Sequence, residues 1–303
     1  MIVGAHCSGG VKRSLDRAAE IGADALQLFV QSPRAWRFPQ HDPSDLARFR
    51  ERREELGLGA VLVHTVYLVN LAAPDDAIYG KSTSTMRSTM EAACAIDADG
   101  VVFHVGSHLG AGFEHGLQRV VPALEQVVER CSERTWLLVE NSAGGGGTIG
   151  RSVDELATLL ERLGRHPRLG ICLDTCHLWV SGYDVTDADT VDRLVEEVDS
   201  KIGLDRLRAL HVNDARDGLG SNRDRHANIG DGVLGEKLRA FLGHPALRDL
   251  PAVLEVPGPD DHGPDAAEVA KLKALYKRAA RSRRPGRTRG RSGARSAARG
   301  TPG

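Results

Sequence analysis

A repeating pattern of short apolar runs constrains the fold of this chain more than any other feature of its sequence. Eight runs rich in Val, Ile and Leu occupy residues 2–6, 25–30, 60–64, 100–104, 136–140, 169–174, 207–211 and 252–255. The last residues of runs three to eight are 40, 36, 34, 37 and 44 positions apart. Such a step accommodates a strand, a helix and two loops, and continuous apolar strands are typical of parallel sheets. Eight units therefore predict a closed (β/α)₈ barrel.

The segments between the runs support this interpretation. Residues 152–164 have helical character, with Ser152 and Glu155 placed as a capping box and Gly164 as the stop. An open doubly wound sheet is the runner-up. It is disfavoured because no Gly-rich phosphate-binding loop follows the first run.

Each of the last six runs ends on a side chain that can bind a metal ion. These residues are His64, His104, Glu140, Asp174, His211 and Glu255. In a barrel, the carboxyl ends of all strands meet at the face where such enzymes carry their active sites. One strand-end histidine or acid is more often structural, but six at the repeat spacing are hard to explain by capping. Histidines and carboxylates without cysteine suit zinc, or manganese and iron at similar geometry.

A further group of the same chemistry lies outside the strand ends. His177 follows Asp174 by three residues, and Asp224 and His226 alternate in a short segment after the seventh run. Residues two apart in an extended segment point to the same side. Together with His177 they form a candidate third ion site.

Composition and charge limit the other classes. The chain has 303 residues, of which 41% are hydrophobic, and its five cysteines are scattered without a CxxC pair, so reduced thiols are expected. No apolar run is long enough for a membrane span, and the N-terminus lacks the layout of a signal peptide. We therefore expect a cytoplasmic protein with no membrane association.

The net charge of -1 conceals an asymmetry. Residues 277–303 contain ten Lys or Arg and no acid, which leaves 30 basic against 41 acidic residues, a formal charge of -11, in residues 1–276. We predict a barrel domain over 1–276 and a disordered basic tail over 277–303. The tail either binds nucleic-acid phosphates or is a solubilising extension.

The ordered motifs resemble the endonuclease IV family of abasic-site nucleases. They are GAHCS (4–8), QSPRAWR (31–37), HTVYLVNL (64–71), FHVGSHLG (103–110), VENSAG (139–144), LDTCHLWVSGYD (173–184), HVNDAR (211–216), DRHANIGDG (224–232) and LEVPG (254–258). One position departs from the family pattern, because Val105 stands where the family usually has Pro. Nearly all of the chain except the tail is covered.

The resemblance implies a xylose-isomerase-like TIM barrel in a single domain that binds three Zn²⁺ ions, with Mn²⁺ or Fe²⁺ as substitutes. It implies a monomeric deoxyribonuclease IV of the phage-T4-induced type. Such an enzyme hydrolyses the phosphodiester bond 5′ to an abasic site in double-stranded DNA, leaving a 3′-OH and a 5′-deoxyribose phosphate. A 3′-repair diesterase activity on blocked 3′ ends is also implied.

Residue roles follow from the resemblance by position. His64 and His104 would hold one zinc, and a second would be held by Asp174, His211 and Glu255. Glu140 would bridge these two ions and serve as the catalytic carboxylate. The third zinc would be held by His177, Asp224 and His226. Arg34 and Tyr67 would enter the duplex at the lesion and help flip the sugar into the site.

The main alternative is a sugar isomerase or epimerase of the same barrel superfamily. Such enzymes hold one metal with four strand-end residues, here Glu140, Asp174, His211 and Glu255. The acidic barrel also suits a small sugar better than a polyanion. The nuclease is favoured because a single-metal site would not need the other five predicted ligands.

Overall fold

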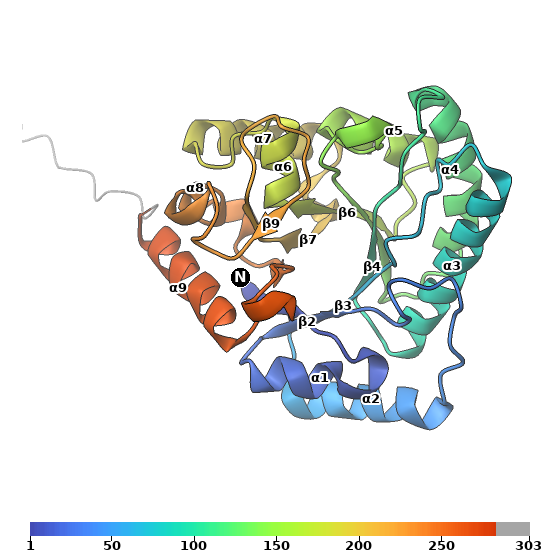
Figure 1. Ribbon diagram of the computed structural model, residues 1–303, viewed down its shortest axis with the longest axis horizontal. Helices are drawn as coiled ribbons and strands as arrows, with labels where there is room; N and C mark the ends of the chain where they lie inside the picture. Colours follow the sequence, from blue (N-terminus) through green and yellow to red (C-terminus); the bar gives the residue numbers. More distant parts are fainter. Residues whose placement is uncertain (283–303) are drawn as a thin grey trace, which may run out of the picture.

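The eight apolar runs form eight parallel strands that close into a barrel (Figure 1). The computed structural model describes residues 1–282. The barrel strands are β1 (Ile2–His6), β2 (Ala25–Leu28), β3 (Ala60–His64), β4 (Gly100–Phe103), β5 (Trp136–Glu140), β6 (Leu169–Asp174), β7 (Leu207–His211) and β10 (Pro251–Leu254). Their order is β1-β10-β7-β6-β5-β4-β3-β2, with β1 also paired to β2. This closure confirms the predicted (β/α)₈ TIM barrel and excludes the open sheet.

Helices surround the strands, and Figure 1 shows them as an outer ring. They are α1 (Gly10–Glu20), α2 (Pro43–Leu56), α3 (Asp76–Ala95), α4 (Phe113–Val128), α5 (Val153–Arg162), α6 (Thr175–Ser181), α7 (Ala188–Lys201), α8 (Arg239–Leu242) and α9 (Ala266–Ser282). Short 3₁₀ turns occur at η1 (Gly145–Gly147), η2 (Leu204–Arg206), η3 (Gly235–Leu238), η4 (Pro245–Leu247) and η5 (Pro259–Asp261). Within residues 1–282, none of these helices combines the length and the apolar character needed to cross a membrane.

The predicted cap of α5 is present, although one half of it differs from a capping box. The Ser152 side chain accepts a hydrogen bond from the Glu155 amide at 3.2 Å. The Glu155 carboxylate, however, accepts from the amides of Gly150 and Arg151 at 2.8 and 3.2 Å. It therefore orders the loop that precedes the helix.

Two layers of side chains fill the barrel. Six residues form an apolar cluster of their own, with Trp136 packed against it, namely Leu62, Val102, Leu138, Cys172, Ala209 and Val253. Each precedes a predicted strand-end ligand by two positions, and alternate residues of a strand face the same side. We call these six residues the lower layer. The upper layer is the eight residues one pleat above, at the C-terminal end of the barrel: His6, Gln27, His64, His104, Glu140, Asp174, His211 and Glu255.

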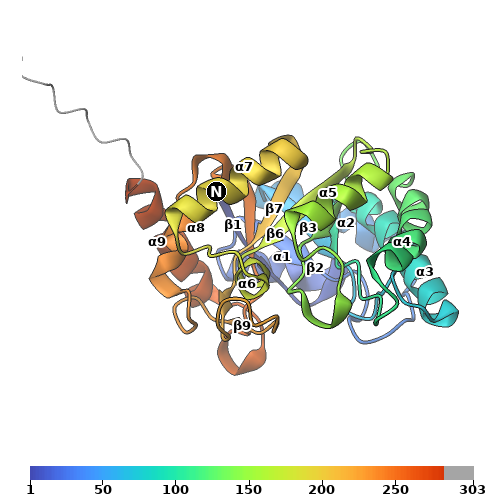
Figure 2. The ribbon, with the colours of Figure 1, turned by 90° about the horizontal axis from the view of Figure 1, so that it is seen from above.

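A small antiparallel pair lies outside the barrel. Strands β8 (Asp214–Ala215) and β9 (His226–Ala227) bracket the loop that carries Asp224. Figure 2 shows β9 beside α6, on the same side of the molecule. Helix α6 carries His177, so the pair brings the predicted third site together.

The last helix corrects the predicted domain boundary. Helix α9 continues to Ser282, so the expected boundary at residue 276 lies six residues too early. Ala279 is fully buried in the core, and Arg278 forms an ion pair with Glu236 at 2.5 Å. The charged side chains of this segment are exposed on a helix whose small residue Ala279 packs against the core. Composition alone does not reveal this arrangement. The predicted disorder of the rest of the tail falls outside the described residues.

Candidate metal centre

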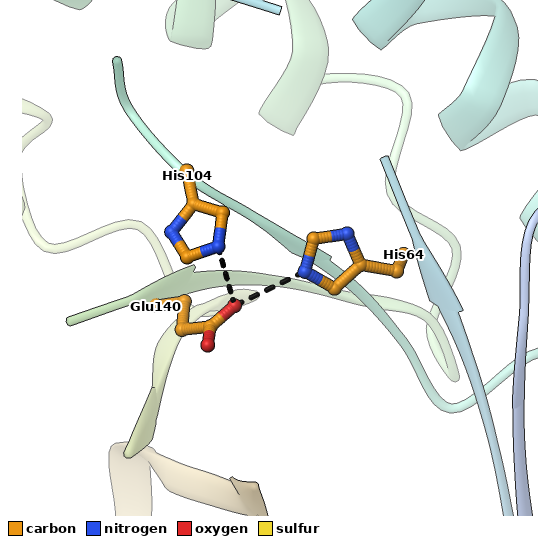
Figure 3. A group of neighbouring side chains, drawn as sticks. All are labelled: His64, His104 and Glu140. Carbon is orange, nitrogen blue, oxygen red and sulfur yellow. Dashed lines mark hydrogen bonds and ion pairs between the residues drawn. The ribbon is translucent and has the colours of Figure 1, made fainter. Parts of the chain in front are cut away.

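The first cluster joins the ends of three neighbouring strands, β3, β4 and β5. The Nε2 atoms of His64 and His104 lie 3.1 and 3.3 Å from Oε2 of Glu140, as Figure 3 shows. His64 and Glu140 are buried, whereas the side chain of His104 is 33% exposed. The three ligand atoms are close enough to hold one ion, with an opening to solvent at His104.

The second cluster uses the other oxygen of the same carboxylate. Nδ1 of His211 lies 2.9 Å from Oε1 of Glu140 and 3.0 Å from Oε2 of Glu255. Ligand atoms of these three residues and of Asp174 all lie within 4.8 Å of one another. Because Glu140 directs one oxygen to each cluster, it has the position that a bridging ligand requires.

The third cluster lies at the rim of the barrel. Nε2 of His177 is 3.1 Å from Oδ2 of Asp224, and Nε2 of His226 is 3.2 Å from Oδ1 of the same carboxylate. The Asp224 side chain is 52% exposed, whereas His177 is buried. Asp174 also lies near this group, with its Oδ2 at 3.8 Å from His226. It therefore stands between the second and third clusters.

The carboxylates and histidines of these clusters stabilise one another's charged forms. Burial alone would raise the pKa of Glu140, but the charges of His104 and His211 hold it well below its usual range. Burial would likewise lower the pKa of His226, but Asp174 and Asp224 raise it to about 9. In the metal-free protein, protons on histidine thus balance the buried carboxylates. A divalent cation can take over that role.

The donor atoms fit such a cation. Nε2 of His177 and Nε2 of His226 are buried and make no hydrogen bond, although both lie close to Asp224. Two imidazole nitrogens that converge on one carboxylate without hydrogen-bond geometry form a donor set that suits a shared cation. The nitrogen and carboxylate donors of all three clusters suit zinc, manganese or iron.

Backbone carbonyls select which ring nitrogen faces two of these clusters. Nδ1 of His64 donates to the Thr65 carbonyl at 2.7 Å, and Nδ1 of His177 donates to the Asn141 carbonyl at 3.0 Å. When either ring is neutral, its lone pair is therefore on Nε2, the nitrogen that faces the cluster. Partners of this kind fix the orientation of metal-binding histidines.

Two asparagines that the sequence interpretation missed brace the carboxylates. Asn213 Nδ2 donates to Oδ2 of Asp174 at 2.6 Å, and Asn213 Oδ1 accepts from the Glu255 amide at 2.8 Å. Asn141 Oδ1 accepts from the Asp174 amide at 2.6 Å. Both asparagines follow a predicted ligand within two positions, which is the signal that could have found them.

Asp214 was also missed, and it orders the loop of the third cluster. Its carboxylate accepts hydrogen bonds from the backbone amides of five residues, namely Ala215, Gly230, Gly232, Leu234 and Gly235. A Cβ on Gly232 would lie 2.4 Å from Oδ1 of Asp214, so only glycine allows this approach. The loop held in this way follows β9, which carries His226.

The predicted DNA-contacting residues lie at one cleft of about 820 Å³ on the same face. Arg34 and Tyr67 line it together with His6. Tyr67 is 72% exposed and its ring meets Phe29 edge-on at 5.4 Å. Tyr67 therefore does not pack in the core.

The remaining motif residues behave as packing groups. Val105, the departure from the family pattern, is buried, and its carbonyl accepts from the Leu71 amide at 3.0 Å. Burial raises the pKa of Cys7 to about 12 and that of Cys172 to about 11, so both are thiols at neutral pH. Cys176 lies near Asp224 and His226, but its thiol donates to the Arg225 carbonyl.

An eight-stranded barrel with a ring of His, Asp and Glu at its C-terminal face defines a class of TIM-barrel proteins with candidate metal sites. Residues 15–278 match the family described as xylose isomerase-like TIM barrel. A protein of Methanoculleus marisnigri named "Probable endonuclease 4" is 39% identical over 279 residues, which cover 91% of this chain and 99% of the relative. The crystal structure of endonuclease IV from Thermus thermophilus is similar with a TM-score of 0.80 and 34% identity, covering 92% of this chain and 100% of that one. The chain belongs to the endonuclease IV family.

More distant structures share the fold alone. A D-tagatose 3-epimerase-like protein is 19% identical with a TM-score of 0.68, and it covers 92% of this chain and 98% of its own. The barrel is thus common to nucleases and sugar enzymes, and the side chains at its C-terminal face must distinguish them.

Proposed function

We propose that this protein is a DNA-repair endonuclease that hydrolyses the phosphodiester bond 5′ to an abasic site, leaving a 3′-OH and a 5′-deoxyribose phosphate. A 3′-repair diesterase activity on blocked 3′ ends would use the same site. One observation carries the proposal: the two oxygens of Glu140 face two different ligand clusters, and a third cluster adjoins them. The names of the 37–39% identical relatives support it.

Three Zn²⁺ ions would be held by the nine clustered residues, with Mn²⁺ or Fe²⁺ as substitutes. His64, His104 and Glu140 would hold the first. Glu140, Asp174, His211 and Glu255 would hold the second, and His177, Asp224 and His226 the third. When bound, such ions activate water and offset the negative charge of the phosphodiester. Glu140, which is buried and held as a carboxylate, would be shared between the first two ions.

The chain's own contribution to DNA binding lies beside this centre. The guanidinium of Arg34 is exposed and would contact a DNA phosphate. The exposed ring of Tyr67 would fill the gap left by a missing base. The formal charge of -11 in residues 1–276 does not exclude a DNA substrate, because local charge governs binding. We expect a monomer that acts on double-stranded DNA in the cytoplasm.

A single-metal sugar isomerase or epimerase is the second candidate. The four residues it would need, Glu140, Asp174, His211 and Glu255, do lie within one cluster. That function gives no role to the cluster in which His177 and His226 converge on Asp224.

Incision of a duplex oligonucleotide carrying one tetrahydrofuran abasic analogue tests the proposal, because the analogue blocks β-elimination and only hydrolysis can cut it. We expect zinc-loaded wild type to cut 5′ to the analogue and Glu140→Gln to be inactive. Glu125→Gln, an exposed change on α4, is the matched control and should cut normally. Failure of folded, zinc-loaded wild type to cut would contradict the nuclease and direct attention to sugar substrates.

A further inference from the structure

Gln27 is a fully buried amide in the middle of β2, within a run that is otherwise apolar. Its register partners are His6 on β1 and Leu62 on β3. A buried side-chain amide must find hydrogen-bond partners, because leaving its donors and acceptor unpaired is costly. The partners that it finds reveal what it does.

All three partners of Gln27 belong to the upper layer. Its Nε2 donates to Oε1 of Glu255 at 2.6 Å and contacts Nδ1 of His6 at 3.1 Å. Its Oε1 lies 2.8 Å from Nε2 of His211. Two of these residues, Glu255 and His211, belong to the second metal cluster.

The charge of Glu255 decides which way the amide points. A carboxylate only accepts hydrogen bonds, so the amide nitrogen must face Glu255 and the amide oxygen must face His211. The reverse orientation would place two acceptors 2.6 Å apart.

This orientation determines the tautomer of His211. Because the amide oxygen can only accept, Nε2 of His211 must carry the proton. The lone pair of a neutral ring is then on Nδ1, which faces Glu140 and Glu255 at 2.9 and 3.0 Å. His64 and His177 instead present Nε2, because backbone carbonyls hold their Nδ1 protons.

We propose that Gln27 is a positioning residue for the second metal ion. It fixes the His211 tautomer so that Nδ1 binds the ion, and it orients the Glu255 carboxylate beside it. Strands β1 and β2 contribute none of the nine predicted ligands. Gln27 on β2 instead contacts two of those ligands, His211 and Glu255. This inference rests on the metal centre of the proposed function.

The first test is metal content under graded chelator, measured by elemental analysis together with incision activity. Gln27→Met keeps the side-chain length and removes the amide. We expect this variant to fold and to bind the first and third ions as tightly as wild type does. It should bind the second ion about 10- to 100-fold more weakly, the usual effect of losing a hydrogen-bond partner of a metal ligand. Gln31→Met is the matched control, because Gln31 is also buried but donates to the Ala35 carbonyl, and it should keep wild-type metal affinity.

The second test needs no variant and so does not depend on how Gln27→Met folds. In ¹⁵N spectra of zinc-loaded wild type, we expect the His211 ring to carry its proton on Nε2 and to bind through Nδ1. A proton on Nδ1, or undiminished metal affinity in folded Gln27→Met, would overturn the role of Gln27 while leaving the nuclease intact. Wild type that binds no ion would overturn both.

Discussion

Each residue of the lower layer lies two positions before a residue of the upper layer, yet the two layers have opposite chemistry. On β5, Leu138 belongs to the apolar cluster, and Glu140 two residues later joins three histidines. On β7, Ala209 and His211 repeat the arrangement. One pleat, two residues, separates a layer that stabilises the fold from a layer that can bind ions.

The two layers make opposite demands on free energy. The lower layer gains stability when its side chains leave water, with about 25 cal/mol per Å² of apolar surface buried. The upper layer brings buried carboxylates and imidazoles together, which is favourable only if protons or cations compensate their charges. Stability should therefore depend on ions and pH in the upper layer and on packing in the lower one.

Placing an acid in the lower layer should have the largest effect. Leu138→Asp buries a carboxylate with no partner, and we expect a loss of about 4 kcal/mol or more in the free energy of unfolding, enough to prevent stable folding. Leu138→Met, which nearly conserves volume, should lose less than about 1.5 kcal/mol. Urea denaturation of the metal-free proteins measures both. If Leu138→Asp were as stable as Leu138→Met, the two layers would not differ as described.

Removing the carboxylate that orders the rim should have the next largest effect. Asp214→Ala leaves five backbone amides without their acceptor, and we expect a loss of about 3 kcal/mol, since some of these amides would find water. The loop after β9 should also lose protection from hydrogen exchange. Unchanged exchange there would show that Asp214 does not hold the third cluster in place.

Ions should stabilise the upper layer in a pH-dependent way. At a free Zn²⁺ concentration of 100 times the dissociation constant, one site adds about 2.7 kcal/mol to the free energy of unfolding. The pKa of His226 is raised from 6.5 to about 9, so in the metal-free protein its contribution to stability is complete below pH 6.5 and is lost as the pH rises through 9. An ion must displace that proton, so zinc affinity should instead rise over the same range.

Calorimetric titration with zinc in buffers of different ionisation enthalpy checks this sign. We expect proton release at pH 7 and little release above pH 9 from this group. Uptake of protons on zinc binding would contradict the assignment of His226 as a ligand.

The smallest effect should come from a conservative change in the lower layer. Cys172 packs among apolar side chains directly below Asp174, and its raised pKa keeps it a thiol. Cys172→Ala should lose about 1 kcal/mol of stability and keep wild-type zinc content and incision. Loss of an ion from this variant would mean that Cys172 takes part in the metal centre, against its assignment to packing.

Much of the fold was predictable because its signals are local. A buried parallel strand is an apolar run wherever it lies, and the spacing of eight such runs indicated the barrel. The strand-end residues from His64 to Glu255 could be found in the same way, since each ends a run. The boundary at residue 276 was wrong because a composition average does not detect a helix that buries Ala279 and exposes its charges.

The sequence by itself thus determined the barrel, the positions of the predicted ligands and the kind of ion that suits them. Only the tertiary structure decided which atoms meet: that Glu140 divides its oxygens between two clusters, that Asp214 orders a distant loop, and that Gln27 faces His211 and Glu255. These last contacts join residues 184 and 228 positions apart. Residue type and strand period are properties of a short segment, whereas the direction of a hydrogen bond depends on every strand that closes the barrel.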